Sequence, residues 1–195
     1  MTTVAEQEVD QKKADSRMTA AQFSRIHNPH GIRMELVEGE LHVSPSPRPR
    51  HIRATKVLLM LLENYVQEKG LGEMFVDLDT TLGPWDVRCP DLLFVPRERV
   101  ARMNPDASAT HADARLVVEV VSPGSVKIDR EDKFAEYAAV GIPYYWIVDP
   151  GQRIAEGYEL AGGVYRLATS ASGAGNFSAS PFPELQIALQ PLWWD

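Results

Sequence analysis

Two acidic residues stand inside apolar stretches of the sequence, and both could take part in chemistry. Glu119 interrupts the largely β-branched run 116–122, and Asp91 follows a proline and precedes the apolar run 92–95. An unpaired buried charge is costly, so such a carboxylate is paired, bound to a metal or protonated. Glu119 is therefore either satisfied by an arginine or a backbone donor, or it is a metal ligand or an acid–base group.

Lys133 is the candidate cation for Glu119. It lies on a helix predicted over 129–140, where Asp129, Lys133 and Tyr137 share one face because they are four residues apart. The neighbouring apolar stripe must pack on a sheet, so Lys133 lies at its border and could reach Glu119. The alternative is a solvated lysine that pairs with an aspartate of its own helix.

The helix connects two apolar segments that read as buried strands, 116–122 and 144–149. A strand–helix–strand unit of this length predicts two parallel strands with a right-handed connection. The sequence therefore predicts an α/β protein, with Glu119 on the first strand and Lys133 on the crossover helix.

Other elements follow from hydrophobic periodicity and turn residues. Before the Glu119 strand they are a helix from Thr19 to about His27, a hairpin over 33–44 with Glu38 and Gly39 at its turn, and a helix from His51 to Lys69 ended by Gly70. Antiparallel strands over 73–82 and 87–95 and a polar connection over 97–114 follow. After residue 150 they are a hairpin over 154–160 and 164–168, a Ser/Ala/Gly loop over 170–180, and an edge strand over 185–189. Residues 1–17 are polar and aperiodic, which predicts a flexible arm before a single domain over 18–195.

The predicted hairpin over 33–44 carries two further acids. Glu35 and Glu40 would share one face, while Leu36, Leu41 and Val43 would face the core. A polar outer face explains the two glutamates, and a supporting role at a metal site is the alternative.

Basic residues gather where the long helix begins. Arg50, His51, Arg53 and Lys56 lie in its first turns, where positive charge opposes the helix dipole. Contacts with a phosphate backbone would explain this placement, and so would a solvated basic end.

The composition excludes several classes of protein. The formal charge is −7, and the single cysteine, Cys89, excludes an internal disulfide and a metal site built from several cysteines. No apolar run reaches the length of a membrane span and the N-terminus has no signal-peptide pattern, so we expect a cytoplasmic protein without a membrane partner. Zinc-ligand spacing, a glycine-rich phosphate loop and a nucleophile-elbow serine are absent from the sequence.

A Pro-Asp strand, an acidic residue on the neighbouring strand and a nearby lysine resemble the PD-(D/E)XK nuclease superfamily. The chain resembles more closely the Uma-type family of restriction-endonuclease-like proteins, over roughly Met18 to Leu192. The matching residues are Glu35 to Leu41, the Ser-Pro loop with His51, Pro90 and Asp91, Glu119 to Pro123, Asp129, Lys133, Tyr137, Gly141, and Tyr145 to Pro150.

The resemblance implies a restriction-endonuclease-like core, in which helices flank a central mixed β-sheet. It also implies a DNA endonuclease that depends on Mg²⁺ or Mn²⁺. Asp91, Glu119 and Lys133 would be catalytic, with Asp91, Glu119 and Glu40 as metal ligands. Glu35 and Tyr137 would support them, and the basic residues at the start of the long helix would contact DNA.

One residue departs from the wider superfamily. Its usual lysine stands two residues after the acid, and that position is Val121 here. Residues i and i+2 of a strand share a face, so Val121 occupies the place of the lysine. Lys133 is expected to supply the ammonium from the following helix instead.

Three functions stay open at this point. The first is the endonuclease, and the second is a catalytically degenerate nuclease fold that binds nucleic acid or protein. The third is an unrelated enzyme that uses the same carboxylates on a small substrate. A homodimer is compatible with each of them.

Overall fold

The computed structural model describes residues 17–26 and 32–194. The predicted arm over 1–17 lies outside the described residues except for Arg17, and so does His27, the predicted end of the first helix. That helix, α2, spans Ala20–Phe23 and is capped by the side chain of Thr19. None of the helices in the described ranges has the length and hydropathy needed to cross a bilayer.

The chain forms a mixed α/β structure with a six-stranded sheet at its centre. The order of this sheet is β11-β10-β9-β8-β6-β3, with β8 parallel to β9 and the other pairs antiparallel. Its strands are β3 (Gly72–Val76), β6 (Leu92–Pro96), β8 (Leu116–Val120), β9 (Tyr144–Asp149), β10 (Ile154–Ala161) and β11 (Val164–Ser172). The predicted parallel pair around Glu119 and the predicted hairpin before residue 170 are thus confirmed.

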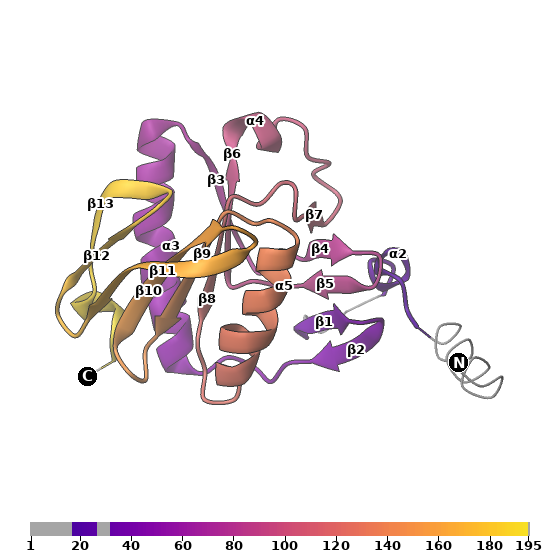
Figure 1. The fold of residues 1–195 in the computed structure, drawn as a ribbon, viewed down its shortest axis with the longest axis horizontal. Helices are drawn as coiled ribbons and strands as arrows, with labels where there is room; N and C mark the ends of the chain where they lie inside the picture. Colours follow the sequence, from indigo (N-terminus) through magenta and orange to yellow (C-terminus); the bar gives the residue numbers. More distant parts are fainter. Residues whose placement is uncertain (1–16, 27–31, 195) are drawn as a thin grey trace.

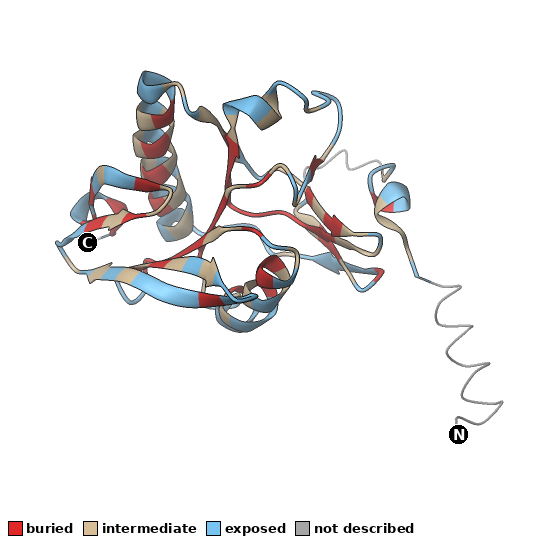
Figure 2. Cartoon of the chain, turned by 45° about the horizontal axis from the view of Figure 1, so that its top comes forward, coloured by how far each residue is buried: buried red, intermediate tan, exposed pale blue. Residues whose placement is uncertain are grey.

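A helix covers each face of this sheet (Figure 1). The long helix α3 (Pro49–Lys69) ends at Gly70, whose φ of 61° suits glycine. Its buried residues Leu58 and Leu62 pack with Val118 and Val120 of β8. On the other face, Tyr137 of α5 (Lys133–Ala139) packs with Val117. Figure 2 shows buried residues along α3 and through the strands.

A five-stranded sheet lies beside the central one, in the order β2-β1-β5-β4-β7. Its strands are β1 (Met34–Val37), β2 (Glu40–Val43), β4 (Thr80–Gly83), β5 (Asp86–Arg88) and β7 (Ala109–Thr110). The hairpin of β1 and β2 turns at Glu38 and Gly39, as predicted, and both residues have positive φ. The short helix α4 (Arg97–Val100) leads from β6 toward β7.

The burial predicted for β2 is wrong. Leu41 and Val43 are 44% and 61% exposed, whereas Leu36 and Glu35 of β1 are buried. β2 is the edge strand of its sheet, so its side chains lie beyond the small core that Leu36 forms with Phe23 and Val87. The sequence alternation placed the apolar face correctly on β1 but could not show which strand was at the edge.

The two strands predicted over 73–82 and 87–95 each divide in two. β3 and β6 pair in the central sheet, while β4 and β5 pair in the smaller sheet (Figure 1). The breaks fall at 77–79 and 89–91, and Asp77 has a φ of 47° in the first of them. Because the hairpin changes sheet here, Asp91 lies at the junction of the two sheets.

The C-terminal region also differs from the prediction. Residues 170–180, predicted as a loop, contain the end of β11 and the strand β12 (Asn176–Ala179). β12 pairs with β13 (Phe182–Ala188) in a separate two-stranded sheet, so the last strand does not extend the central sheet. Phe177 and Phe182 explain this placement, since both rings pack on Trp146 of β9.

Candidate active site

Glu119 lies on β8, on the face that α5 covers, and its carboxylate is satisfied by two donors. Lys133 Nζ donates to Glu119 Oε1 over 2.9 Å, and Tyr137 Oη donates to the same oxygen over 2.9 Å. All three side chains are buried. The predicted approach of Lys133 to Glu119 is confirmed, because the shared helical face of Lys133 and Tyr137 points at this strand.

The ammonium of Lys133 is surrounded by carboxylates. Besides Glu119, Glu35 Oε1 lies 3.1 Å from Lys133 Nζ and Asp129 Oδ1 lies 3.8 Å from it. Burial disfavours a charged lysine, but these carboxylates outweigh that effect and raise the pKa of Lys133. Lys133 is therefore held charged and fixed in position.

The helix that carries these residues begins with a wide turn. One α-helix was predicted over 129–140, but Ile128–Asp132 form a π-helical turn before α5 starts at Lys133. The hydroxyl of Tyr145 donates to the carbonyl of Asp129 over 2.8 Å. A side-chain donor at a helical carbonyl is compatible with such a departure from α-helical bonding, and wide turns of this kind are frequent at functional sites.

Asp91 immediately precedes β6, and both of its carboxylate oxygens have partners. Arg33 Nη1 donates to Oδ1 over 2.6 Å. The backbone N–H of Val120 donates to Oδ2 over 2.6 Å, and His51 Nε2 lies 3.1 Å from that oxygen. Arg33 also connects the two acids, since its Nη2 lies 3.9 Å from Glu119 Oε2.

The two carboxylates differ in their affinity for a proton. Burial would raise the pKa of Asp91, but the hydrogen bond with His51 and the charge of Arg33 hold it well below its usual value. Burial raises the pKa of Glu119 to about 8, since desolvation and the charges of Asp91 and Asp129 outweigh Lys133. Near neutral pH, Asp91 is charged and Glu119 retains much of its proton.

Glu35 ties the cluster to the smaller sheet. Its Oε1 accepts the backbone N–H of Cys89 over 3.0 Å, and its Oε2 accepts Arg88 Nη1 over 3.0 Å. Arg88 in turn donates through Nε and Nη2 to Glu136 of α5, over 2.7 and 2.6 Å. Because Glu35 also contacts Lys133, this chain of charges fixes β1 and β5 against α5.

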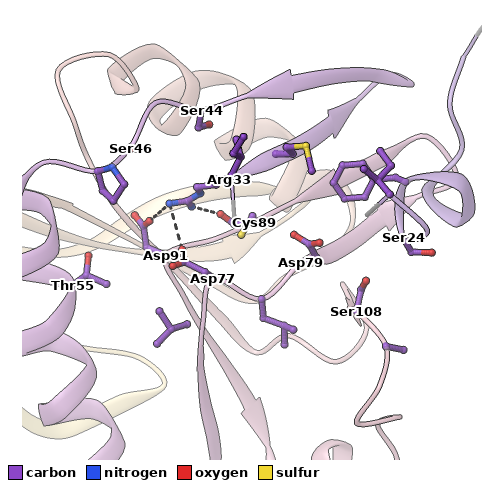
Figure 3. A pocket seen from close by; sticks show the side chains of 18 of the residues that line it. Ser24, Arg33, Ser44, Ser46, Thr55, Asp77, Asp79, Cys89, Asp91 and Ser108 are labelled. Atoms are coloured by element: carbon purple, nitrogen blue, oxygen red, sulfur yellow. Dashed lines mark hydrogen bonds and ion pairs between the residues drawn. The ribbon is translucent and has the colours of Figure 1, made fainter. Parts of the chain in front are cut away.

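Two adjoining cavities meet at Asp91 and Arg33. The smaller cavity, of about 250 Å³, is lined by Glu119, Lys133 and Arg48 among others. The larger cavity, of about 970 Å³, extends past Asp77 toward the loop that contains Asp106. The residues that line both cavities, and so form the boundary between them, are Arg33, Ser44, Ser46, Pro47, His51 and Asp91. Figure 3 shows Arg33 and Asp91 in the larger cavity.

The structure brings together most of the site residues suggested by the sequence. Glu35, His51, Asp91, Glu119 and Lys133 line the smaller cavity, and Tyr137 is buried behind it in contact with Glu119. His51, suggested as a DNA contact, faces Asp91 instead. Glu40 is exposed on the edge strand β2 and lines neither cavity, because β1 lies between β2 and β5.

The basic residues at the start of α3 divide into two groups. Arg50 and Lys56 are exposed, as a DNA contact requires. Arg53 is also exposed, but its Nε donates to the carbonyl of Pro191 over 3.1 Å and its guanidinium lies 5.7 Å from the ring centre of Trp194. Arg53 therefore serves the contact between α3 and the C-terminal segment.

Sequence reasoning missed Arg33, Arg88 and Asp77. Arg88 had a signal of the same kind as Glu119, because it is a charged residue between Val87 and Cys89. Arg33 and Asp77 had none, since Arg33 begins the predicted hairpin and Asp77 lies in a predicted alternating strand, where a polar side chain is ordinary. Their positions depend on which strands become neighbours.

The donor set suits a hard divalent cation. Asp91 Oδ1 and Glu119 Oε2 converge on one guanidinium, so the two carboxylates can share a cation. Among the described residues, three or more His, Cys, Asp or Glu side chains do not gather in a way that could hold a metal. Mg²⁺ needs only one or two carboxylates, with water and substrate phosphate as its other ligands, so these residues fit it.

The chain is similar to a crystal structure of a putative nuclease belonging to DUF820 from Anabaena variabilis ATCC 29413, with a TM-score of 0.73 and 16% sequence identity, over 90% of this chain and 97% of that chain. This likeness shows a shared restriction-endonuclease-like fold. None of the curated proteins compared with the chain matches it significantly. The model of the Uma2 family, described as "Putative restriction endonuclease", matches residues 20–190, so the chain belongs to the Uma2 family.

Proposed function

We propose that the protein is a metal-dependent DNA endonuclease that hydrolyses phosphodiester bonds at the smaller cavity. The observation that carries the proposal is the meeting of two carboxylates and one lysine at this cavity. Glu119 lies 2.9 Å from Lys133 and is linked to Asp91 through Arg33. Membership of a nuclease family supports the same reaction class.

Each residue has a role that follows from its contacts. Asp91 and Glu119 would hold Mg²⁺ or Mn²⁺, which when bound acidifies a water and neutralises charge on the phosphate. The backbone N–H of Val120 holds Asp91 Oδ2 and the hydroxyl of Tyr137 holds Glu119 Oε1, so Asp91 Oδ1 and Glu119 Oε2 would be left for such a cation. Lys133 orients the attacking water or stabilises the charge that develops on the phosphate.

Lys133 takes the role that Val121 cannot perform. Val121 is buried in the apolar cluster beneath α5, next to Tyr137. The ammonium of Lys133 nevertheless reaches Glu119 from α5. Only the location of the charge matters for the chemistry, so a lysine from the helix can replace one from the strand.

Removal of the metal tests the proposal. The purified protein should cleave supercoiled plasmid or linear duplex DNA in Mg²⁺ or Mn²⁺. Excess EDTA should stop the reaction, because it removes the metal that neutralises the negative charge of the phosphate. Gel electrophoresis of the products measures this. Cleavage that EDTA leaves unchanged contradicts metal dependence. DNA binding without cleavage in either metal would support the degenerate binding module.

DNA is expected to approach over the beginning of α3. Arg48 lines the smaller cavity, and Arg50 is exposed two residues further on, in the first turn of α3. Changing both to glutamine should weaken binding to all duplex sequences alike and flatten the slope of log affinity against log salt by about 0.9 per lost phosphate contact. Fluorescence anisotropy across salt concentrations measures the slope.

A control for this experiment lies on β11. Arg166 is exposed on that strand, which belongs to the opposite edge of the central sheet from β3. Arg166→Gln removes one positive charge far along the chain and should leave the slope as in the wild type. If Arg166→Gln changed the slope as much as the Arg48 and Arg50 double variant does, only net charge would matter. An unchanged slope in the double variant would place the DNA elsewhere on the surface.

A further inference from the structure

The guanidinium of Arg33 lies between the carboxylates of Asp91 and Glu119. Its Nη1 donates to Asp91 Oδ1 over 2.6 Å, and its Nη2 donates to the carbonyl of Cys89 (Figure 3). The same Nη2 lies 3.9 Å from Glu119 Oε2. Asp91 Oδ1 and Glu119 Oε2 are the pair of oxygens that a shared cation would contact. The other two already accept from Val120 N–H and from Lys133 and Tyr137.

The guanidinium and a divalent ion cannot both contact this pair of oxygens. Arg33 carries the one positive charge that reaches both carboxylates in the described part of the chain, and its side chain is 20% exposed. Since Asp91 is only 2% exposed, its charge needs partners with and without metal. His51 and the Val120 N–H contact Oδ2, so the partner that Oδ1 needs is Arg33 or a metal. Arg33 meets that need, so a metal that binds here must displace it.

A second acceptor for Arg33 stands on the side of the larger cavity. Asp77 Oδ1 lies 3.5 Å from the same Nη1, beyond hydrogen-bond contact with good geometry, and the side chain of Asp77 is 60% exposed. Asp77 lies in the bend between β3 and β4, with a φ of 47°. Both Arg33 and Asp77 line the larger cavity, so a small rotation there can bring them into direct contact.

We propose that Arg33 is the internal counter-cation of the metal-free site and that divalent metal binding transfers its guanidinium from Asp91 to Asp77. The proposal rests on the proposed function in so far as Asp91 and Glu119 bind the metal. Arg33 and Asp77 are then positioning residues that set metal affinity. Arg33 lowers the affinity because it competes for Asp91, and Asp77 raises it because it receives the displaced charge.

The experiment is calorimetric titration with Mn²⁺ alone, without DNA, on four proteins. They are the wild type, Arg33→Met, Asp77→Asn and the double variant. Removing the competitor should tighten Mn²⁺ binding by about tenfold to a hundredfold, the range set by one displaced hydrogen bond between charged groups. Removing the acceptor should weaken binding by about twofold to fivefold on the wild-type background.

The double variant separates transfer of Arg33 from general electrostatics. If Asp77 acts by receiving Arg33, Asp77→Asn should change affinity by less than about twofold once Arg33 is methionine. An equal loss on both backgrounds would mean that Asp77 acts as a distant negative charge and would overturn the transfer. Unchanged or weaker binding in Arg33→Met would overturn the competition.

Arg88→Met is the matched control. Arg88 also lies between two carboxylates, Glu35 and Glu136, but it is buried and lines neither cavity. Both arginine variants should melt at lower temperature than the wild type, yet only Arg33→Met should tighten Mn²⁺ binding. An equal gain in Arg88→Met would assign the effect to lost positive charge and contradict the proposal.

Two provisions keep the result decisive. If Arg33→Met fails to fold, Arg33→Lys takes its place, because lysine retains the charge but cannot span both carboxylates. Arg33→Lys should bind Mn²⁺ more tightly than the wild type. Equal or weaker Mn²⁺ binding would overturn the proposal. If the wild type and Asp91→Asn both bind no Mn²⁺, the proposed function fails. Binding by the wild type that Arg33→Met leaves unchanged overturns the present inference alone.

Discussion

Lys133→Met is expected to lower the rate of DNA cleavage by at least about a hundredfold, the usual effect of removing one donor that stabilises transition-state charge. The ammonium of Lys133 lies within 4 Å of Glu119, Glu35 and Asp129, in a site with little exposure. Metal affinity should be retained or increased, because the change removes a positive charge beside Glu119. Single-turnover cleavage and calorimetry measure the two quantities separately.

The same variant should also lose stability. Removing one partner of a buried ion pair typically costs about 3–5 kcal/mol, because the remaining charges are left unpaired. Urea unfolding of the metal-free protein measures this loss. Lys127→Met is the control, because Lys127 is exposed on the turn before the same helix and has the same side chain. Small and equal effects from the two variants would remove Lys133 from the mechanism.

Local sequence patterns were sufficient to predict the contact between Glu119 and Lys133. An apolar strand fixes the face on which Glu119 lies, because side chains alternate along it. The four-residue spacing of Lys133 and Tyr137 fixes their common direction on the helix. A strand–helix–strand unit then brings the two faces together, and the structure places Lys133 Nζ 2.9 Å from Glu119 Oε1.

Contacts between distant segments could not be predicted in the same way. Arg33 and Asp91 are 58 residues apart, and Arg88 and Glu35 are 53 apart. These pairs meet because the hairpin over 73–95 divides between two sheets. The alternation of apolar and polar residues is the same on either side of the break, so it does not reveal the division. For a related reason the sequence could not show that Glu35 is buried and Glu40 is exposed. That difference depends on which strand of the hairpin lies at the edge of the sheet.

The partners of Asp91 change the interpretation of the carboxylate pair. Two acids that share a metal would each be expected to hold a proton more tightly when no metal is bound. Asp91 does not hold its proton more tightly, because its contacts with Arg33, His51 and the Val120 N–H keep its pKa low. Glu119 does hold its proton more tightly, since burial raises its pKa to about 8. The metal-free site thus contains one charged and one largely protonated carboxyl group near neutral pH.

Glu119→Gln should therefore leave the metal-free protein at least as stable as the wild type at pH 9. Glutamine can still accept from Lys133 and Tyr137, which donate to Glu119 Oε1, and Lys133 keeps Glu35 as a partner. The folded pKa of about 8 exceeds the unfolded value of about 4.3. The contribution of Glu119 to stability is thus fully present below pH 4.3 and is lost as the pH rises through 8.

The pH dependence and the metal response together test this argument. The stability of the wild type relative to Glu119→Gln should fall between pH 5 and pH 9, which urea unfolding at both pH values measures. Mn²⁺ at a hundred times its dissociation constant should stabilise the wild type by about 2.7 kcal/mol, because only the folded state has the site. Glu119→Gln should lose most of this gain. A loss of about 3–5 kcal/mol in the metal-free variant at pH 9, with no metal response in the wild type, would instead make Glu119 and Lys133 a structural ion pair.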